Sequence, residues 1–286
     1  MKVSAEIIQK IRSLEIHTKR ILAGGSTGEY TSKKRGFGLE FDQLRDYQTG
    51  DDVRSIDWKS TARANKLLVR EYLQERNKTI MVVVDFSASM YYASRSQDLK
   101  SDIAAQIASV IALVTISMRD MIGVVIVHGT KNIVIPPGRG RSHVHYIMQQ
   151  LFSCTPEGGP SLNEALRTVL QMNRKDMMVV IISDFLLPEY ERMLLLCSRR
   201  HETIVIHSYD PLERTFVNVG LLNVQDPETG KTAVVATRSG AFRKFLEEHE
   251  QKCNASFRRA RVDVVPLAVD EPFIGKLIKF FRKRMV

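Results

Sequence analysis

The stretch MVVVDFSASM, residues 81–90, decides the fold, because it joins an apolar run to three oxygen-bearing side chains. Four apolar residues lead into Asp85, and Ser87 and Ser89 follow at alternate positions. Valine-rich runs of this kind form buried strands, and side chains two apart in an extended segment point the same way. The stretch therefore predicts a buried strand whose end presents one carboxylate and two hydroxyls toward one point.

A second predicted strand also ends in an aspartate. The run MMVVIISDF, residues 177–185, places Asp184 after apolar residues. Other apolar segments are strand-like at 121–129, 132–137 and 202–210, and helical at 98–118, 141–153, 161–172 and 190–200. This alternation predicts an α/β fold, a mostly parallel sheet with helices on both faces. Ligands of such sheets gather at the carboxyl ends of the strands, where the strand order reverses. If the two strands are neighbours, Asp85 and Asp184 lie at one edge.

The predicted edge offers only oxygen ligands. A hard divalent ion such as Mg²⁺ accepts one or two carboxylates and keeps several waters. Zinc favours histidine and cysteine, and neither lies near these residues in the sequence. We therefore expect Asp85, Ser87, Ser89 and Asp184 to hold Mg²⁺ or Mn²⁺.

The pattern Asp85-x-Ser87-x-Ser89, followed by Ser183-Asp184, resembles the metal-ion-dependent adhesion site of von Willebrand factor A (VWA) domains. Residues 38–72, 199–213 and 220–231 are similar to an uncharacterised bacterial family with such a domain, typically encoded beside MoxR-type AAA+ ATPases. The resemblance covers nearly the whole chain. It implies a VWA-like, doubly wound sheet in residues 79–286, with a C-terminal elaboration, after an N-terminal helix and family-signature segment in residues 1–78. It also implies a MoxR-type ATPase and an unknown client protein as partners.

One departure concerns the third loop of the adhesion site. A Gly-Gly-Thr pattern supplies a threonine hydroxyl in VWA domains, whereas this chain reads EGGPSLNEAL, with Pro160 at that position. Proline cannot ligate a metal, so Ser161, Thr155 or a water would have to take its place, or the site is inherited but degenerate. Ser161 also suits the start of a helix.

The segment before the predicted domain has two parts. Residues 5–23 show helical spacing of apolar residues, which predicts an amphipathic helix, whereas residues 26–75 show no clean period and predict an irregular or extended lead-in. Residues of opposite charge lie close together in the 38–72 signature, beside a tryptophan. They form either an internal network or a docking surface, because arginine and tryptophan anchor interfaces. The residues that a docking surface would use are Arg45, Asp51, Arg54, Asp57, Trp58 and Arg63.

The composition of the chain bears on the charge of its partners, on its cellular compartment and on contact with membranes. The 286 residues carry a net charge of +10, with 32 acidic residues mixed among 42 basic ones, which favours an anionic partner only weakly. Three isolated cysteines fit a reducing, cytoplasmic setting, and the apolar runs are too interrupted to predict a transmembrane segment. Residues 273–286 combine an apolar stripe with basic residues, which predicts a terminal helix docked on the core or, alternatively, peripheral contact with an acidic membrane surface.

Three functions follow in order of preference. The first is a non-enzymatic protein-interaction module, in which a bound metal accepts a carboxylate from a partner. The second is a hydrolase using the Asp-Ser-x-Ser loop, but that motif lacks a histidine or lysine base and does not have the form Gly-x-Ser-x-Gly. The third is nucleic-acid binding by the basic clusters at 33–35, 258–261 and 282–284, which lack interleaved aromatic residues.

Overall fold

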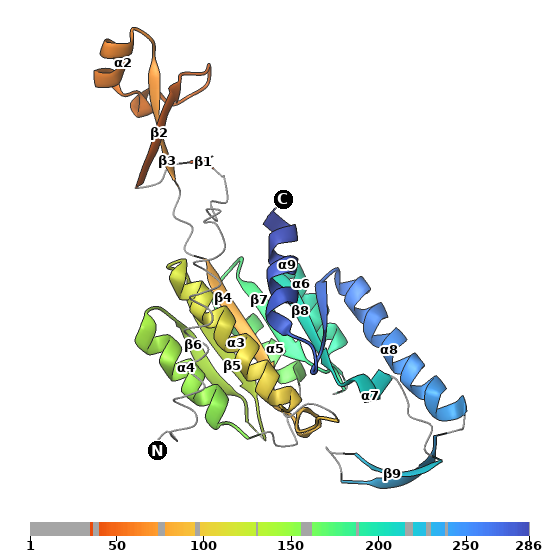
Figure 1. The fold of residues 1–286 in the computed structure, drawn as a ribbon. Helices are drawn as coiled ribbons and strands as arrows, with labels where there is room; N and C mark the ends of the chain where they lie inside the picture. Colours follow the sequence, from red (N-terminus) through yellow and green to blue (C-terminus); the bar gives the residue numbers. More distant parts are fainter. Residues whose placement is uncertain are drawn as a thin grey trace. The chain divides into compact units, whose positions relative to one another are not determined.

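The structure is a computed structural model that describes most of the chain, and its elements are shown in Figure 1. The described residues are 35–36, 40–73, 78–94, 98–129, 131–155, 162–186, 189–214, 220–226, 230–237 and 240–285. Two compact units are distinguished: a smaller one within Thr27–Asn77 and a larger one that includes the chain from Lys78 onward. The helix predicted at residues 5–23 lies outside the described residues.

The larger unit is built on a six-stranded sheet with the strand order β11-β8-β7-β4-β5-β6. The strands are β4 (Thr79–Asp85), β5 (Met121–Val127), β6 (Ile133–Gly138), β7 (Met178–Ser183), β8 (Glu202–Tyr209) and β11 (Asp263–Ala268). All neighbouring pairs are parallel except β5 and β6. Strands β5 and β6 follow β4 in the sequence and lie on one side of it. The later strands β7, β8 and β11 lie on the other side. The strand order therefore reverses between β4 and β7.

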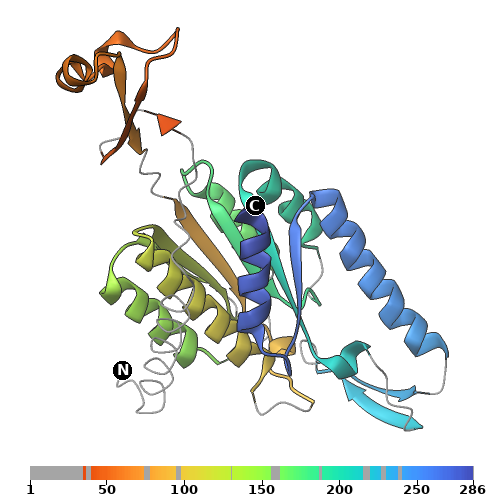
Figure 2. The ribbon, with the colours of Figure 1, turned by 45° about the horizontal axis from the view of Figure 1, so that its top comes forward.

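Helices cover both faces of this sheet, as Figures 1 and 2 show. One face packs against α3 (Lys100–Ser117), α4 (Arg141–Ser153) and α9 (Phe273–Met285), and the other against α5 (Leu162–Gln171), α6 (Glu191–Arg200) and α8 (Gly240–Ala260). Val82 and Val84 belong to the first core, whereas Met81 and Val83 belong to the second. A strand buried on both faces needs a continuous apolar run. The prediction of a doubly wound α/β fold is confirmed.

The most apolar helix, α3, owes its character to this core. Among the described helices, it has the length and composition that crossing a membrane would require, but most of it is buried inside the larger unit. Ile107, Ala108 and Ala112 are fully buried in the core. The C-terminal helix α9 also docks on this core, as predicted, because Phe273 and Leu277 are buried in it. The three cysteines are free.

Smaller elements complete the larger unit. The short turns η2 (Ala88–Met90) and α7 (Pro211–Arg214) follow the carboxyl ends of β4 and β8. Strands β9 (Leu221–Gln225) and β10 (Thr232–Ala236) form a separate antiparallel pair.

The smaller unit is more regular than its sequence suggested. Strands β1 (Arg35–Gly36), β2 (Glu40–Asp46) and β3 (Leu68–Leu73) form an antiparallel sheet, and η1 (Val53–Ser55) and α2 (Trp58–Ala64) lie between β2 and β3. Asp57 begins α2, because its side chain accepts a hydrogen bond from the Ser60 backbone N–H, and Asn65 ends it with φ at 55°. Strands β2 and β3 correspond to the extended part of the predicted irregular or extended lead-in, whereas the helix α2 was not predicted. A seven-residue helix held by caps is too short to show a period.

Candidate functional site at the carboxyl edge

Asp85 lies at the point where the strand order reverses. Because β4 and β7 pair in parallel, with Val84 opposite Ile182, both strands end at the same edge. The Asp85 side chain is fully buried. One of its oxygens accepts a hydrogen bond from the Ser87 backbone N–H at 2.9 Å, and the other from the Ser183 hydroxyl at 2.6 Å. The carboxylate is therefore held by the ends of both strands.

The two predicted serines meet beside this carboxylate. The Oγ atoms of Ser87 and Ser89 lie 3.1 Å apart, and both side chains are buried. Turn η2 begins directly after Ser87 and brings the second hydroxyl back toward the first. The sequence pattern thus assembles a compact group of oxygen atoms from one strand end and one turn.

Asp85 is a buried acid without an ion pair among the described residues. Burial raises the pKa of its carboxyl from the ordinary 3.8 to about 6, and the nearby charge of Asp184 adds to this rise. The hydrogen bonds from Ser183 and Ser87 oppose the shift but do not cancel it. A cation at this position would favour the ionised form of Asp85, because an opposite charge lowers the pKa of an acid.

Asp184, in contrast, is paired with a cation of the chain itself. The Nζ atom of Lys100 lies 2.7 Å from Asp184 Oδ2 and 2.6 Å from Glu213 Oε1, and the Lys100 side chain is completely buried. Burial lowers the pKa of Lys100, but the charges of Asp184 and Glu213 outweigh that effect and raise it to about 12. Lys100 is therefore an ammonium ion that joins α3, β7 and α7.

The sequence interpretation missed Lys100 and Glu213. A signal for Lys100 was present, because it is a lysine at the start of a helix that is apolar nearly all round. A third strand end also carries an aspartate, Asp210 after β8, which accepts hydrogen bonds from the Ser94 backbone N–H at 2.8 Å and from the Ser94 hydroxyl. The backbone N–H of Asp210 donates to Glu213 at 2.8 Å. The carboxyl edge is thus cross-linked by polar contacts between three loops.

Three large exposed side chains follow the residues of this buried polar group in the sequence. Phe185 adopts the left-handed φ of 57°, uncommon for a bulky residue, and its ring packs edge-on against Tyr190 and Phe257 inside the protein. The next residue, Leu186, is 45% exposed. Tyr91 and Tyr92, just after η2, are 65% and 42% exposed. The loops that leave β4 and β7 at this edge therefore carry both buried polar groups and large exposed side chains.

The donor set fits a weakly held hard cation. Asp85, Ser87 and Ser89 offer oxygen atoms alone, which suits Mg²⁺ or Mn²⁺. Asp184 is neutralised by Lys100, and Pro160 and Ser161 lie outside the described residues. Within the described part of the chain, no group of three or more histidine, cysteine, aspartate or glutamate side chains is arranged to hold a metal. An ion would therefore depend on one carboxylate, two hydroxyls and water.

Among the described residues, the Ser87 hydroxyl has no basic side chain as a hydrogen-bond partner. The Ser87 hydroxyl contacts the Ser89 hydroxyl, and Lys100 stays protonated because its pKa is raised to about 12. The ring of His207 contacts the backbone carbonyl of Asp184 at 3.2 Å and packs against Phe185. A general base must lie within hydrogen-bond reach of the proton that it removes, and it must be in its deprotonated form.

In the smaller unit, half of the predicted docking residues bond to other residues of that unit. Arg45 makes a two-pronged contact with Asp51, at 2.6 and 2.7 Å. The hydrogen bond from Arg45 and that from the Gln48 backbone lower the pKa of Asp51 to about 2. Asp57 caps α2 and accepts a hydrogen bond from Arg70 at 3.0 Å. These contacts correspond to the internal network that we weighed against a docking surface.

The other predicted docking residues point outward. Trp58 is 62% exposed, and the nearby Val53 is 58% exposed. Arg54 and Arg63 are exposed, and their side chains make no ion pair within the described residues. Trp58, Arg54 and Arg63 therefore stay candidates for partner contact, whereas Arg45, Asp51 and Asp57 have structural partners.

Comparison with known proteins identifies a family to which the sequence is related. Residues 43–256 match the family described as protein of unknown function DUF58. An uncharacterized protein of Mycobacterium bovis is 28% identical over 281 residues, which cover 96% of this chain and 88% of that protein. An uncharacterized protein of Mycobacterium avium is 27% identical over 156 residues, covering 52% of this chain and 92% of that protein.

The comparison with solved structures includes a match at low identity. The crystal structure of the SpRpn10 VWA domain has 14% identity and a TM-score of 0.42, covering 70% of this chain and 93% of that chain. The assignment of a VWA-like fold rests on the sheet itself, with five parallel strands, one antiparallel edge strand and helices on both faces.

Proposed function

Because the chain belongs to the DUF58 family of proteins of unknown function, we propose that it is a non-enzymatic protein-interaction module. Its contact surface is the carboxyl edge of the six-stranded sheet. A divalent cation held by Asp85, Ser87 and Ser89 makes binding metal-dependent, and the partner is a MoxR-type AAA+ ATPase. The pair would act in the cytoplasm on an unknown client protein, in its maturation or remodelling.

The observation that carries this proposal is the exposure of three large side chains in the loops of the carboxyl edge. Tyr91, Tyr92 and Leu186 are large, exposed and close in sequence to the residues that hold the buried oxygen atoms. Protein interfaces are enriched in tyrosine, and their energy is concentrated in a few central side chains. Side chains that a partner covers remove water from a nearby polar contact and strengthen it. These residues suit the capture of another protein better than catalysis.

Each residue has a different role at the proposed site. Asp85 supplies the negative charge for the ion, Ser87 and Ser89 supply neutral oxygen atoms, and Ser183 holds Asp85 in place. When bound, Mg²⁺ or Mn²⁺ would offer a coordination position to a carboxylate of the partner. Lys100 pairs with both Asp184 and Glu213, so Asp85 is the one proposed ligand that brings a negative charge to the ion. Metal binding should therefore be weak in the isolated protein and tighter in the complex.

The choice of a MoxR-type ATPase rests on the family resemblance of residues 38–72, 199–213 and 220–231. The test is a pull-down of the ATPase, expressed from the same genome, by the tagged chain with Mg²⁺ or with a chelator. Asp85→Asn keeps the size of the side chain but removes its charge, so capture in Mg²⁺ should fall at least about tenfold.

A matched control is Asp176→Asn, which changes an exposed aspartate just before β7, at the opposite edge of the sheet. Asp176 has φ at 55°, a conformation that asparagine tolerates, so folding should be preserved. Capture by this variant should equal that of the unmodified chain. Equal capture with and without Mg²⁺, or full capture by Asp85→Asn, would refute the metal-dependent mechanism. Failure of the unmodified chain to retain the ATPase would refute the partner.

A further inference from the structure

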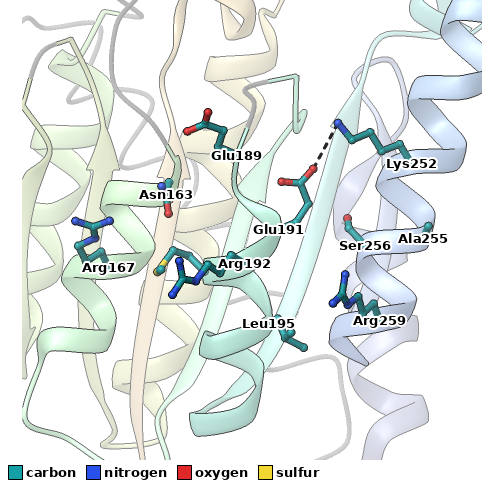
Figure 3. A pocket seen from close by; sticks show the side chains of 11 residues that line it. Asn163, Arg167, Glu189, Glu191, Arg192, Leu195, Lys252, Ala255, Ser256 and Arg259 are labelled. Carbon is teal, nitrogen blue, oxygen red and sulfur yellow. Dashed lines mark ion pairs between the residues drawn. The ribbon is translucent and has the colours of Figure 1, made fainter.

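A second surface of the larger unit has the features of a binding site. A groove of about 700 Å³ lies on the face covered by α5, α6 and α8, and Figure 3 shows its side chains. The groove includes residues at the N-terminal ends of α5 and α6, such as Asn163 and Glu191, and continues along α8 to Arg259. None of its lining residues belongs to the metal-site group at the carboxyl edge.

The groove carries an excess of unpaired positive charge. Arg167 on α5, Arg192 on α6 and Arg259 on α8 all line it and are exposed. Within the described residues, the three guanidinium groups make no hydrogen bond or ion pair with other side chains. Lys252 is paired with Glu191 at 3.7 Å, as the dashed line in Figure 3 shows. Three positive charges drawn from three helices therefore face solvent, and they would attract an anionic ligand.

One further feature of the groove favours a peptide over a phosphate. The guanidinium groups present planar forks of donors that match either a carboxylate or a phosphate, so the difference must come from another group. Asn163 Oδ1 is buried and has no hydrogen-bond partner among the described residues. An unpaired buried acceptor is costly, and a backbone N–H of a bound peptide can satisfy it, whereas an ionised phosphate has no hydrogen to donate.

The rest of the lining agrees with a peptide. Leu195 and Ala255 provide apolar surface between the charges, and Glu189 is an exposed acid that would repel a continuous phosphate backbone. The described residues that line the groove include no aromatic side chain, so bases would have no ring on which to stack.

We propose that this groove binds an acidic peptide segment of a partner protein. The carboxylates of the segment pair with Arg167, Arg192 and Arg259, and its apolar side chains rest on Leu195 and Ala255. This contact uses different residues from the carboxyl-edge site and requires no metal ion. The groove is therefore a second interaction surface, which binds its ligand whether or not the metal-dependent site is occupied.

The test uses the full chain and a fluorescent peptide of about eight residues, in which glutamate alternates with leucine, long enough to span roughly 25 Å when extended. Its partner probe replaces each glutamate by glutamine. The double variant R192E/R259E reverses two groove charges. The double variant R139E/R141E makes the same change in net charge at exposed arginines outside the groove. Fluorescence anisotropy measures the affinity of each, with thermal melts to confirm folding.

We expect the glutamate peptide to bind the unmodified chain and R139E/R141E with equal affinity, and R192E/R259E at least about tenfold more weakly. The glutamine peptide should bind weakly to all three, and Asp85→Asn should bind the glutamate peptide normally. Equal losses in both double variants would show a general charge effect and overturn the proposal. So would the absence of binding, or displacement of the peptide by inorganic phosphate or single-stranded DNA at lower concentration than by unlabelled peptide.

Discussion

Two regions of the larger unit differ in whether their charged side chains are buried and paired or exposed and unpaired. Behind the carboxyl edge, Lys100 is buried and bonded to Asp184 and Glu213. In the groove lined by α5, α6 and α8, Arg192 and Arg259 are exposed and unpaired within the described structure. A buried charge needs its partners for the fold to form, whereas an exposed one is already solvated. The comparison separates charges that maintain the fold from charges that are available to a ligand.

Asp85 does not fit either group. It is as buried as Lys100 but, like the groove arginines, has no ion pair within the described residues. The raised pKa of Asp85 reflects the unfavourable free energy of burying its charge without a counter-ion. A buried charge without a counter-ion in the chain is a reason to expect one from outside, and this is why we assign the cation to Asp85 rather than to Asp184.

The largest effect should come from Lys100→Met, which leaves the buried Asp184 and the partly buried Glu213 without their cation. Loss of one partner of a buried ion pair costs about 3–5 kcal/mol in the free energy of unfolding. Urea unfolding at neutral pH measures this loss. Lys244→Met is the control, because the Lys244–Glu248 pair is exposed on both sides and its removal should cost less than about 1 kcal/mol.

A triple variant sharpens this prediction. Combining Lys100→Met with Asp184→Asn and Glu213→Gln removes all three charges, and most of the lost stability should return, because neutral groups are cheaper to bury than unpaired ions. If Lys100→Met alone were as stable as the unmodified protein, the network would not maintain the fold, and the contrast with the groove would be lost.

An intermediate effect should come from Asp85→Asn, and it should depend on pH. The pKa of Asp85 is raised in the folded state from 3.8 to about 6, so its contribution to stability is fully present below about pH 3.8 and lost as the pH rises through 6. Without metal at pH 8, Asp85→Asn should therefore be more stable than the unmodified protein by about 1–3 kcal/mol. At pH 4 the gain should be small or absent.

Unfolding curves between pH 4 and pH 8, with a chelator present, test this sign. Addition of Mg²⁺ at pH 8 should then stabilise the unmodified protein but not the variant. A variant that is less stable than the unmodified protein at pH 8 would show that the Asp85 charge has a partner that the described residues do not reveal.

The smallest effect should come from removing the groove charges. Replacing Arg192 and Arg259 by alanine should change the free energy of unfolding by less than about 0.5 kcal/mol per site, because neither side chain has a bonded partner among the described residues. Urea unfolding of the two single variants and the double variant measures this. A loss comparable to that of Lys100→Met would make these arginines part of the fold and remove them from the proposed binding surface.

The comparison also shows which parts of the site could be predicted from sequence. Asp85, Ser87 and Ser89 were found because a local pattern places them, two residues apart, at the end of an apolar strand. The Lys100–Asp184 contact was not found, because 84 residues separate its partners and only the packing of α3 against the sheet brings them together. The groove was missed for the same reason, since its arginines come from three helices.

The sequence by itself determined the layers of the larger unit and the chemistry at its strand ends. Short apolar runs rich in β-branched residues indicate strands buried on both faces, and a polar residue that ends such a run lies at the sheet edge. The tertiary structure alone decided which charges are paired. Ion pairing depends on distances of a few ångströms between side chains far apart in the chain, and burial sets the energy of each charge. Sequence periodicity and local motifs specify neither the distances between such side chains nor their burial.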